Sequence, residues 1–321
     1  MTTYIIRRAI QSMIIMVLVS WAVFLLLRLL PGDPLLIYIY QNDLQNLSPT
    51  EMQALRVEFG LDKSLPEQYV NWVSDVARFD FGTSLGRRLP VIDIIKERMP
   101  ITIHLSLVSV VLSTFLGLLF GIIAALKRGS WLDVTVTSVA NIGIATPSFW
   151  VALLLMYLIS FKLGLLPIEG YISPLEDFWG STQTVILPVF ILSWDGIAGL
   201  ARLTRTQMLE VARQDYIRTA RSKGLREHVV IIRHMLKNAM LPLVSNLGMR
   251  FRSIFSGSVL IETVFNIPGM GRVVVEATFG QDYTVVQAVA LISAFLVVWV
   301  NLAVDIAYTW VDPRIKFGRA D

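Results

Sequence analysis

The sequence contains no cysteine among its 321 residues and only three histidines. Without cysteine the chain has no disulfide framework, no cysteine-ligated zinc or iron–sulfur site and no thiol nucleophile. Charged residues are also scarce, because they make up 16% of the chain against about 25% in soluble domains of ordinary composition. Hydrophobic residues make up 55%, and the mean hydropathy is +0.62. This balance excludes a disordered chain and indicates an integral membrane protein.

Motifs for ATP hydrolysis and metal binding are missing as well. No G-x-x-x-x-G-K-[ST] phosphate loop is present, so we expect no ATP hydrolysis by this chain alone. The histidines His104, His228 and His234 are scattered, and there is no H-E-x-x-H motif. We therefore expect no catalytic site, no metal and no cofactor on this chain.

Apolar runs predict an all-α polytopic membrane protein. A bilayer core of about 30 Å needs roughly 20 apolar helical residues. Six segments meet or approach that length: 10–30, 102–126, 134–161, 184–201, 239–261 and 284–310. The first follows Arg7-Arg8, as in a signal peptide, but it is longer than a typical signal core and has no A-x-A-like cleavage site. We therefore interpret it as a retained first helix.

The distribution of Lys and Arg predicts the orientation of these six helices. With a cytoplasmic N-terminus, the cytoplasmic pieces would be 1–9, 127–133, 202–238 and 311–321, which together hold sixteen Lys and Arg residues. The short external loops 162–183 and 262–283 hold one each. Because positive charge accumulates in short cytoplasmic loops, both termini are expected in the cytoplasm. The basic pI of about 9.4 follows from this bias and does not call for a nucleic-acid partner.

The chain is expected to divide into three parts. Residues 1–100 would contain the first helix and a folded external segment, residues 101–310 a five-helix core, and residues 311–321 a cytoplasmic tail. In the external segment, Ser48 to Glu51 and Ser64 to Glu67 both read S-x-x-E, the capping box that starts a helix. Residues 69–77 then follow a helical apolar spacing. This segment is interpreted either as a structured cap or as a docking site for a soluble external partner.

The predicted cytoplasmic loop 202–240 carries nine basic and three acidic residues. We expect a helix from Thr204 to Ser222, followed by Gly224 in the left-handed position that ends helices. Its apolar side would hold Met208, Val211, Ala212, Tyr216, Thr219 and Ala220. A second short helix would place Val229, Ile232 and Leu236 on one face. By composition alone, this loop fits a docking element and a surface lying on anionic lipid equally well.

Several residues inside the predicted spans indicate packing or pathway positions. Gly117 and Gly121 form a small-xxx-small pair that predicts a close helix crossing. Pro147, flanked by Thr146 and Ser148, is expected to bend the third span, with Asn141 on the approach to the bend. The bend is consistent with a gating role and with a passive kink.

Three charges fall where the bilayer should exclude them, namely Asp195, Arg250 and Arg252. An unpaired Arg at the bilayer centre costs at least about 3 kcal/mol. Residues 250 and 252 cannot share a helix face, so Asp195 is a candidate partner for one of them. A structural ion pair and a contact with the transported solute both remain open.

Motifs spread over the whole chain resemble the permease subunits of binding-protein-dependent ABC importers in the dipeptide, oligopeptide and nickel group. The resemblance rests on segments 7–8, 25–34, 59–62, 68–69, 80–84, 214–224, 238–242, 267–271, 282–283 and 312–314. These motifs occur in the expected order along the chain. The resemblance implies a type I importer fold in the prokaryotic cytoplasmic (inner) membrane.

The resemblance also implies that the 202–240 loop carries the EAA motif, which docks on a cytoplasmic ATPase subunit. Arg218-Thr219-Ala220 stands where Glu-Ala-Ala is usual, and Gly224 matches the glycine of the motif. The residues expected to couple the loop to the ATPase are Asp215, Tyr216, Arg218, Thr219, Ala220, Gly224, His228, Leu241 and Pro242.

The implied assembly contains a second, homologous permease, two ATPase subunits that hold ATP and Mg, and an external solute-binding protein. Dipeptides or oligopeptides are the expected solutes, and nickel chelates or glutathione are the alternative. A secondary transporter is a more remote alternative, and it would need an internal repeat that the sequence does not show.

Overall fold

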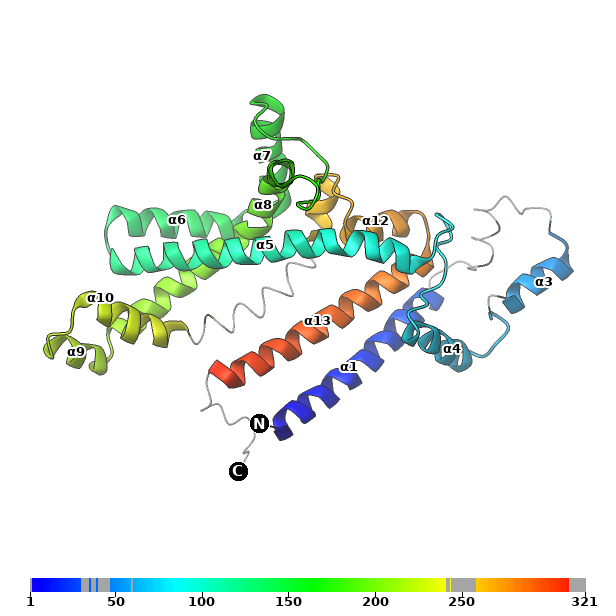
Figure 1. The fold of residues 1–321 in the computed structure, drawn as a ribbon, viewed down its shortest axis with the longest axis horizontal. Coiled ribbons are helices and arrows are strands. Elements are labelled where there is room, and N and C mark those ends of the chain that lie inside the picture. The colour runs from blue at the N-terminus through cyan, green and yellow to red at the C-terminus, as the bar shows by residue number, and fades with distance from the viewer. Residues whose placement is uncertain are drawn as a thin grey trace. The chain divides into compact units, whose positions relative to one another are not determined.

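The computed structural model describes residues 2–29, 35, 39, 47–58, 60–240, 243 and 258–311. These residues form helices and connecting turns, with one isolated antiparallel β-bridge between Thr83 and Pro90. The all-α prediction is therefore confirmed for this part of the chain. The residues fall into two compact units, one made of Met1–Ile5, Thr102–Pro268 and Val300–Asp321, the other of Ile6–Ile101 and Gly269–Trp299. Figure 1 traces the order of the helices.

Four described helices contain an apolar stretch long enough to cross a membrane, and a bent pair of helices supplies a possible fifth. The four are α1 (Thr2–Leu29), α5 (Val91–Leu126), α8 (Phe178–Ala212) and α13 (Tyr283–Val311). Helix α8 is much longer than the predicted segment 184–201. Most of the predicted segment 239–261 lies outside the described residues.

The predicted third span is broken at Pro147, and the break is sharper than the expected bend. The chain bends by 104° between helix α6 (Trp131–Ala145) and the pair formed by α7 (Ser148–Leu155) and the π-helix η1 (Met156–Lys162). Thr146 is extended, as a residue before proline prefers. Its backbone N–H and its hydroxyl both donate to the Ile142 carbonyl, at 2.9 and 2.8 Å. The Thr146 hydroxyl therefore adds a second donor to a carbonyl that already has its helical partner.

Glycines allow α8 to pack closely against α5 and α6. A Cβ atom on Gly117 would lie 2.7 Å from the Leu200 Cβ, and one on Gly121 would lie 2.6 Å from the Ala201 carbonyl oxygen. On α6, a Cβ on Gly143 would lie 2.9 Å from the Ala198 Cβ. Contacts this short exclude any side chain at the three positions. The close crossing predicted from Gly117 and Gly121 is therefore confirmed.

In the second unit, helix α4 (Leu65–Ala77) packs its aromatic face on α1. Both hydrogen bonds of the capping box join Ser64 and Glu67, as predicted. The Tyr69 hydroxyl lies 2.8 Å from the Ser20 hydroxyl, and the Tyr69 ring contacts Trp21 and Phe24 at centroid distances of 5.8 and 5.6 Å. The first capping box, at helix α3 (Pro49–Glu58), is also formed. Part of the segment 31–100 is therefore folded, as expected.

The turn before α5 is attached to the start of α13 through Asp282. The Asp282 carboxylate accepts the Ser84 hydroxyl and the Gly86 N–H (3.2 Å), and it caps α13 through the Val285 N–H (3.3 Å). Helix α12 (Met270–Phe279) packs beside them in a core that includes Val91 and Val285.

Residues 82–86 of this turn also read G-x-S-x-G, the spacing of a nucleophile elbow. Ser84, however, is buried, and its hydroxyl donates a hydrogen bond to the Asp282 carboxylate. It lies in the hairpin closed by the Thr83–Pro90 bridge, not at a strand-to-helix turn. The motif therefore has a structural role here.

The α5–α8 crossing generates a first prediction. Replacing Gly121 with leucine should destabilise the protein by about 1–3 kcal/mol, because the new side chain has to separate the two helices. The measurement is the midpoint of thermal unfolding of the purified protein in detergent. Leu119→Ala, at an exposed position of the same helix, is the matched control. Equal midpoints for the two variants would contradict the close crossing.

Candidate functional site

The 202–240 loop consists of the end of α8 and three short helical pieces. Helix α8 ends at Ala212, and α9 (Asp215–Ser222), α10 (Glu227–Val229) and the π-helix η2 (Val230–Leu236) follow. The single helix predicted from Thr204 to Ser222 is wrong, because the chain turns at Arg213-Gln214. The Gln214 backbone there is extended and forms the N-cap of α9.

A small apolar core holds these pieces together. Its buried side chains come from the end of α5, from α8, from α9 and from the η2 region: Ala125, Met208, Ile217, Ala220, Val230, Met235 and Ala239. Met208 and Ala220 were predicted on the apolar side, but Tyr216 and Thr219 were too, and both are exposed. The turn at residues 213–214 resets the helical phase, so Ile217 is buried in their place.

The apolar face predicted for the second helix is also partly wrong. Val230 and Met235 are buried, whereas Ile232 is 63% exposed. A π-helix has i→i+5 hydrogen bonds instead of i→i+4, and this shifts which residues share a face. Ile232 therefore faces outward, as does Tyr216, which is 43% exposed.

Gly224 ends α9 in the left-handed conformation, as predicted. Its φ is +74°, and its N–H donates to the Arg221 carbonyl at 2.9 Å. A Cβ here would meet no atom within 4 Å, so glycine is favoured by its backbone conformation and not by lack of space. Arg221 also binds the Glu227 carboxylate at 2.7 Å across this turn. That hydrogen bond raises the pKa of Arg221 above its usual value.

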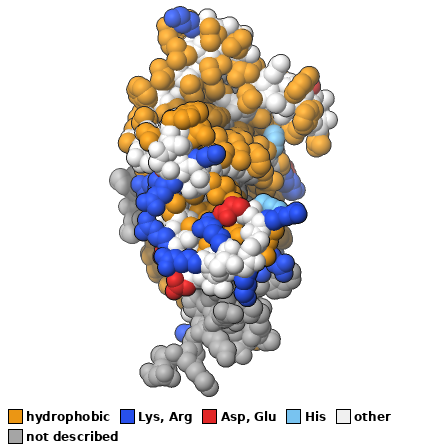
Figure 2. Space-filling model, turned by 90° about the vertical axis from the view of Figure 1, so that its left-hand side faces the viewer, with side chains coloured by type: hydrophobic (Ala, Val, Ile, Leu, Met, Phe, Trp, Pro, Cys, Tyr) orange, Lys and Arg blue, Asp and Glu red, His pale blue; other side chains and the backbone are white. Residues whose placement is uncertain are grey.

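The outer surface of the loop is polar and basic around a few apolar side chains. Figure 2 shows Lys and Arg side chains gathered on the face where the loop lies. Asp215, Tyr216, Arg218, Thr219 and His228 are exposed there. Asp215 and Arg218 form an exposed ion pair of 3.5 Å, which contributes little by itself. This surface can therefore accept a partner with acidic and apolar groups.

One of the residues predicted to couple the loop is not on this surface. Ala220 is only 6% exposed and packs in the core under α9, so its contribution is to hold the helix in place. Leu241 and Pro242 lie outside the described residues.

An ion pair that the sequence did not predict joins the loop-bearing end of α8 to α6. Arg205 binds Asp133 through two hydrogen bonds, Nε to Oδ1 at 2.5 Å and Nη2 to Oδ2 at 2.9 Å. The Gly129 N–H also donates to Asp133, at 2.9 Å. The Asp133 side chain is 6% exposed. The two residues are 72 positions apart, and only the folded packing of α6 on α8 brings them together.

The pathway candidates are partly described. Asn141 on α6 and Pro147 at the break are exposed, and Asp195 is exposed on α8. Arg250 and Arg252 lie outside the described residues, so the proposed pairing with Asp195 stays a prediction. Among the described residues, no group of three or more His, Asp or Glu side chains has the geometry of a metal site.

Comparisons with known proteins find similar sequences over nearly the full length of the chain. Residues 117–317 match the family described as "Binding-protein-dependent transport system inner membrane component", and residues 1–106 match the N-terminal region of such membrane components. A Brucella abortus (strain 2308) protein that carries the name of a peptide transport system permease is 41% identical over 317 residues, covering 99% of this chain and all of the relative. The oligopeptide transport system permease protein AppB of Bacillus subtilis (strain 168) is 38% identical over 320 residues, covering 99% of this chain and 100% of that protein.

The fold also resembles a solved transporter. A chain of the MetNI methionine ABC transporter in an inward-facing conformation superposes with a TM-score of 0.57 at 18% sequence identity. The match covers 68% of this chain and 96% of the other. At this sequence identity it shows the similarity of the fold alone. The family match and the full-length relatives are the stronger findings. The chain therefore belongs to the family of inner membrane components of binding-protein-dependent transport systems.

Proposed function

We propose that this chain forms one half of the transmembrane pathway of an ATP-driven peptide importer, and that its 202–240 loop receives the motion of an ATPase subunit. As an inner membrane component of its family, the chain is a multi-pass permease subunit without an ATPase site of its own. Several full-length relatives carry the names of peptide or oligopeptide permeases. These names favour peptides over nickel chelates or glutathione.

The observation that carries the proposal is the construction of the 202–240 loop. Helix α9 presents Tyr216 and Arg218 to the outside while Ile217 and Ala220 anchor it to Met208 of α8. A helix held by a shared core cannot move without moving α8. A force applied to the surface of α9 is therefore passed into a helix that is long and apolar enough to cross the membrane.

The proposed topology has six spans with both termini in the cytoplasm. The described helices supply four or five of these spans, and the segment 239–261 is proposed as a further one. This arrangement puts the basic 202–240 loop in the cytoplasm, in line with the positive-inside rule. It also puts the segment 31–100 outside, where it would receive the solute-binding protein or seal the outer mouth.

The proposed assembly contains a second, non-identical permease and two ATPase subunits, with ATP and Mg bound to the latter. A binding protein and an ATPase follow from the family of this chain. The heterodimeric pairing is our inference from the resemblance of the motifs.

The Asp133–Arg205 ion pair is proposed to carry motion from α8 to the broken helix. Arg205 lies seven residues before the end of α8, and Asp133 lies in the first turn of α6. The other end of α6 leads into the break at Pro147. When the loop moves α8, the ion pair obliges α6 to follow. Movement at the break then switches the pathway between a state open to the outside and a state open to the cytoplasm.

Gly224→Val tests the coupling role of the loop. A valine at φ +74° carries a conformational cost of about 1–2 kcal/mol or more, so the end of α9 should rearrange. We expect co-purification of the ATPase subunits to be lost while membrane insertion is retained. The measurement is the ratio of ATPase to permease after affinity purification.

Gly129→Val is the matched control for this experiment. Gly129 has φ +76° and is equally open to a new Cβ, but it lies outside the 202–240 loop. Its variant should keep the ATPase. Retention of the ATPase by a correctly inserted Gly224→Val protein would count against the docking assignment.

Asp133→Asn and Arg205→Gln test the proposed transmission. Each change removes one partner of a largely buried ion pair. In a double-mutant cycle, their effects on the free energy of unfolding should be non-additive by about 1–3 kcal/mol. We expect solute transported per ATP hydrolysed to fall in each single variant and to recover partly in the charge-swapped pair Asp133→Arg, Arg205→Asp. Thr137→Ala, which loses only a 3.4 Å contact to Asp133, should behave like the wild type. Unchanged coupling in both single variants would exclude the transmission role.

Arg252→Ala tests the proposed role of the intramembrane charges. If Asp195, Arg250 and Arg252 face the pathway, the variant should change the preference among charged peptides and leave assembly intact. The measurement is competition between acidic and basic dipeptides in an uptake assay with the assembled importer. Loss of assembly with unchanged preference would instead support a structural ion pair.

A further inference from the structure

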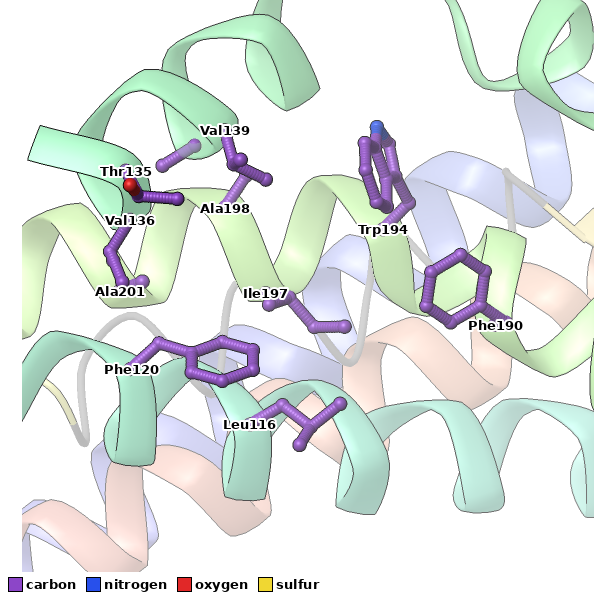
Figure 3. Close-up of a pocket in the computed structure, with 11 residues that line it drawn as sticks. Leu116, Phe120, Thr135, Val136, Val139, Phe190, Trp194, Ile197, Ala198 and Ala201 are labelled. Atoms are coloured by element: carbon purple, nitrogen blue, oxygen red, sulfur yellow. The ribbon is translucent and has the colours of Figure 1, made fainter. Parts of the chain in front are cut away.

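An apolar cavity of about 400 Å³ lies between α5, α6 and α8. Its lining includes Leu116 and Phe120 of α5, Val136 and Val139 of α6, and Trp194 and Ile197 of α8. Figure 3 shows these side chains converging from the three helices. The volume falls within the range of about 300–1,000 Å³ typical of small-ligand sites. By length and composition, α5 and α8 are candidate membrane spans, and α6 is half of the bent pair that could form a further one.

One end of the cavity leads toward exposed cations. Along each helix the lining approaches the short turn between α5 and α6, where Phe120, Thr135 and Ala201 are the last lining residues. The next cations along the chain are Lys127 and Arg128, seven and eight residues past Phe120 in the turn after α5, and Arg202, the residue after Ala201 on α8. All three are exposed. No ion pair with any of the three is found among the described residues. Trp131, the first residue of α6, is 73% exposed, and tryptophan is enriched at membrane interfaces.

We propose that this cavity binds one acyl chain of an anionic phospholipid, whose phosphate lies against Lys127, Arg128 and Arg202. The apolar lining matches a hydrocarbon chain, and the three cations match a phosphate at the end of that chain. Basic sites between transmembrane helices on the cytoplasmic side suit anionic headgroups. The leaflet follows from the proposed topology, in which the turn 127–133 is cytoplasmic, so the inference rests on the proposed function in that respect.

The position of the site gives the lipid a consequence for transport. The cavity separates α6 from parts of α8 and α5, and the Asp133–Arg205 ion pair crosses from α6 to α8 beside its basic end. A chain in the cavity supports α6 where the protein supplies no side chain. Lipid occupancy therefore sets how firmly α6 follows α8.

The test uses the assembled importer in vesicles of equal parts phosphatidylglycerol and phosphatidylethanolamine. One lipid at a time carries a photoactivatable diazirine in its acyl chain. Val136→Phe fills the cavity, and Val134→Phe, on the exposed opposite side of α6 and 61% exposed, is the matched control. We expect labelling of α5, α6 and α8 by phosphatidylglycerol to fall at least about fivefold in Val136→Phe and to stay at the wild-type level in Val134→Phe.

The headgroup is tested separately with Lys127→Gln, Arg128→Gln and Arg202→Gln combined. Each cation near an anionic headgroup contributes on the order of fivefold in affinity, so the preference for phosphatidylglycerol over phosphatidylethanolamine should fall at least about tenfold. Lys162→Gln, a cation at the end of η1, should leave the preference unchanged.

Three outcomes would overturn the inference. Equal labelling of the Val136→Phe and Val134→Phe proteins would show that no chain occupies the cavity, and labelling independent of headgroup charge would show surrounding bilayer lipid only. Thiol cross-linking of a Val136→Cys variant to the second permease would show a subunit interface instead. ATPase co-purification is scored on the same preparations. Gly224→Val, prepared in the same way, separates the two proposals. Loss of its ATPase together with cavity-independent labelling overturns the lipid site alone. Retention of its ATPase together with cavity-dependent labelling overturns the loop assignment alone.

Discussion

The contact of α8 with its two neighbours is the constraint on which the 102–268 part of the structure depends. Gly117 and Gly121 admit Leu200 and Ala201 at distances that no side chain on α5 would allow, and Gly143 admits Ala198 in the same way. In a bilayer, close packing of this kind replaces the hydrophobic effect as the force that joins helices. Because α8 continues past these contacts to Ala212, the same helix also carries the base of the 202–240 loop. The same helix therefore packs against α5 and α6 and carries the surface proposed to dock the ATPase.

The features that could be predicted from sequence are those set by local chemistry. The glycine pair on α5, the capping boxes at Ser48 and Ser64, the interruption at Pro147 and the left-handed Gly224 each depend on residues within one or two turns. A short motif determines the outcome in these cases, since the competing conformations are excluded by sterics or by unsatisfied hydrogen bonds. The apolar runs likewise predicted most of the helices that the structure describes.

The features that escaped prediction depend on which face of a helix a residue occupies, or on contacts between residues far apart in the sequence. The apolar faces of α9 and η2 were misplaced because a two-residue turn and a π-helix each shift the angle between successive side chains. A periodicity argument assumes an unbroken α-helix, so it assigned Tyr216 and Ile232 to the inside. The Asp133–Arg205 ion pair was missed for a different reason. Neither residue has a local signal, and their pairing follows only from the packing of α6 on α8.

The central claim is that the surface of α9 meets an ATPase subunit, and the absence of cysteine from the chain allows a direct measurement. Tyr216→Cys places a single thiol on the outer face of α9, and Thr137→Cys places one on α6 as a control. Thiol cross-linking in membranes that contain the assembled importer is followed by identification of the linked chains. The account predicts that the cysteine at 216 links to an ATPase subunit and the one at 137 does not. A cysteine at 216 that reacts with soluble thiol reagents but never links to the ATPase would contradict it.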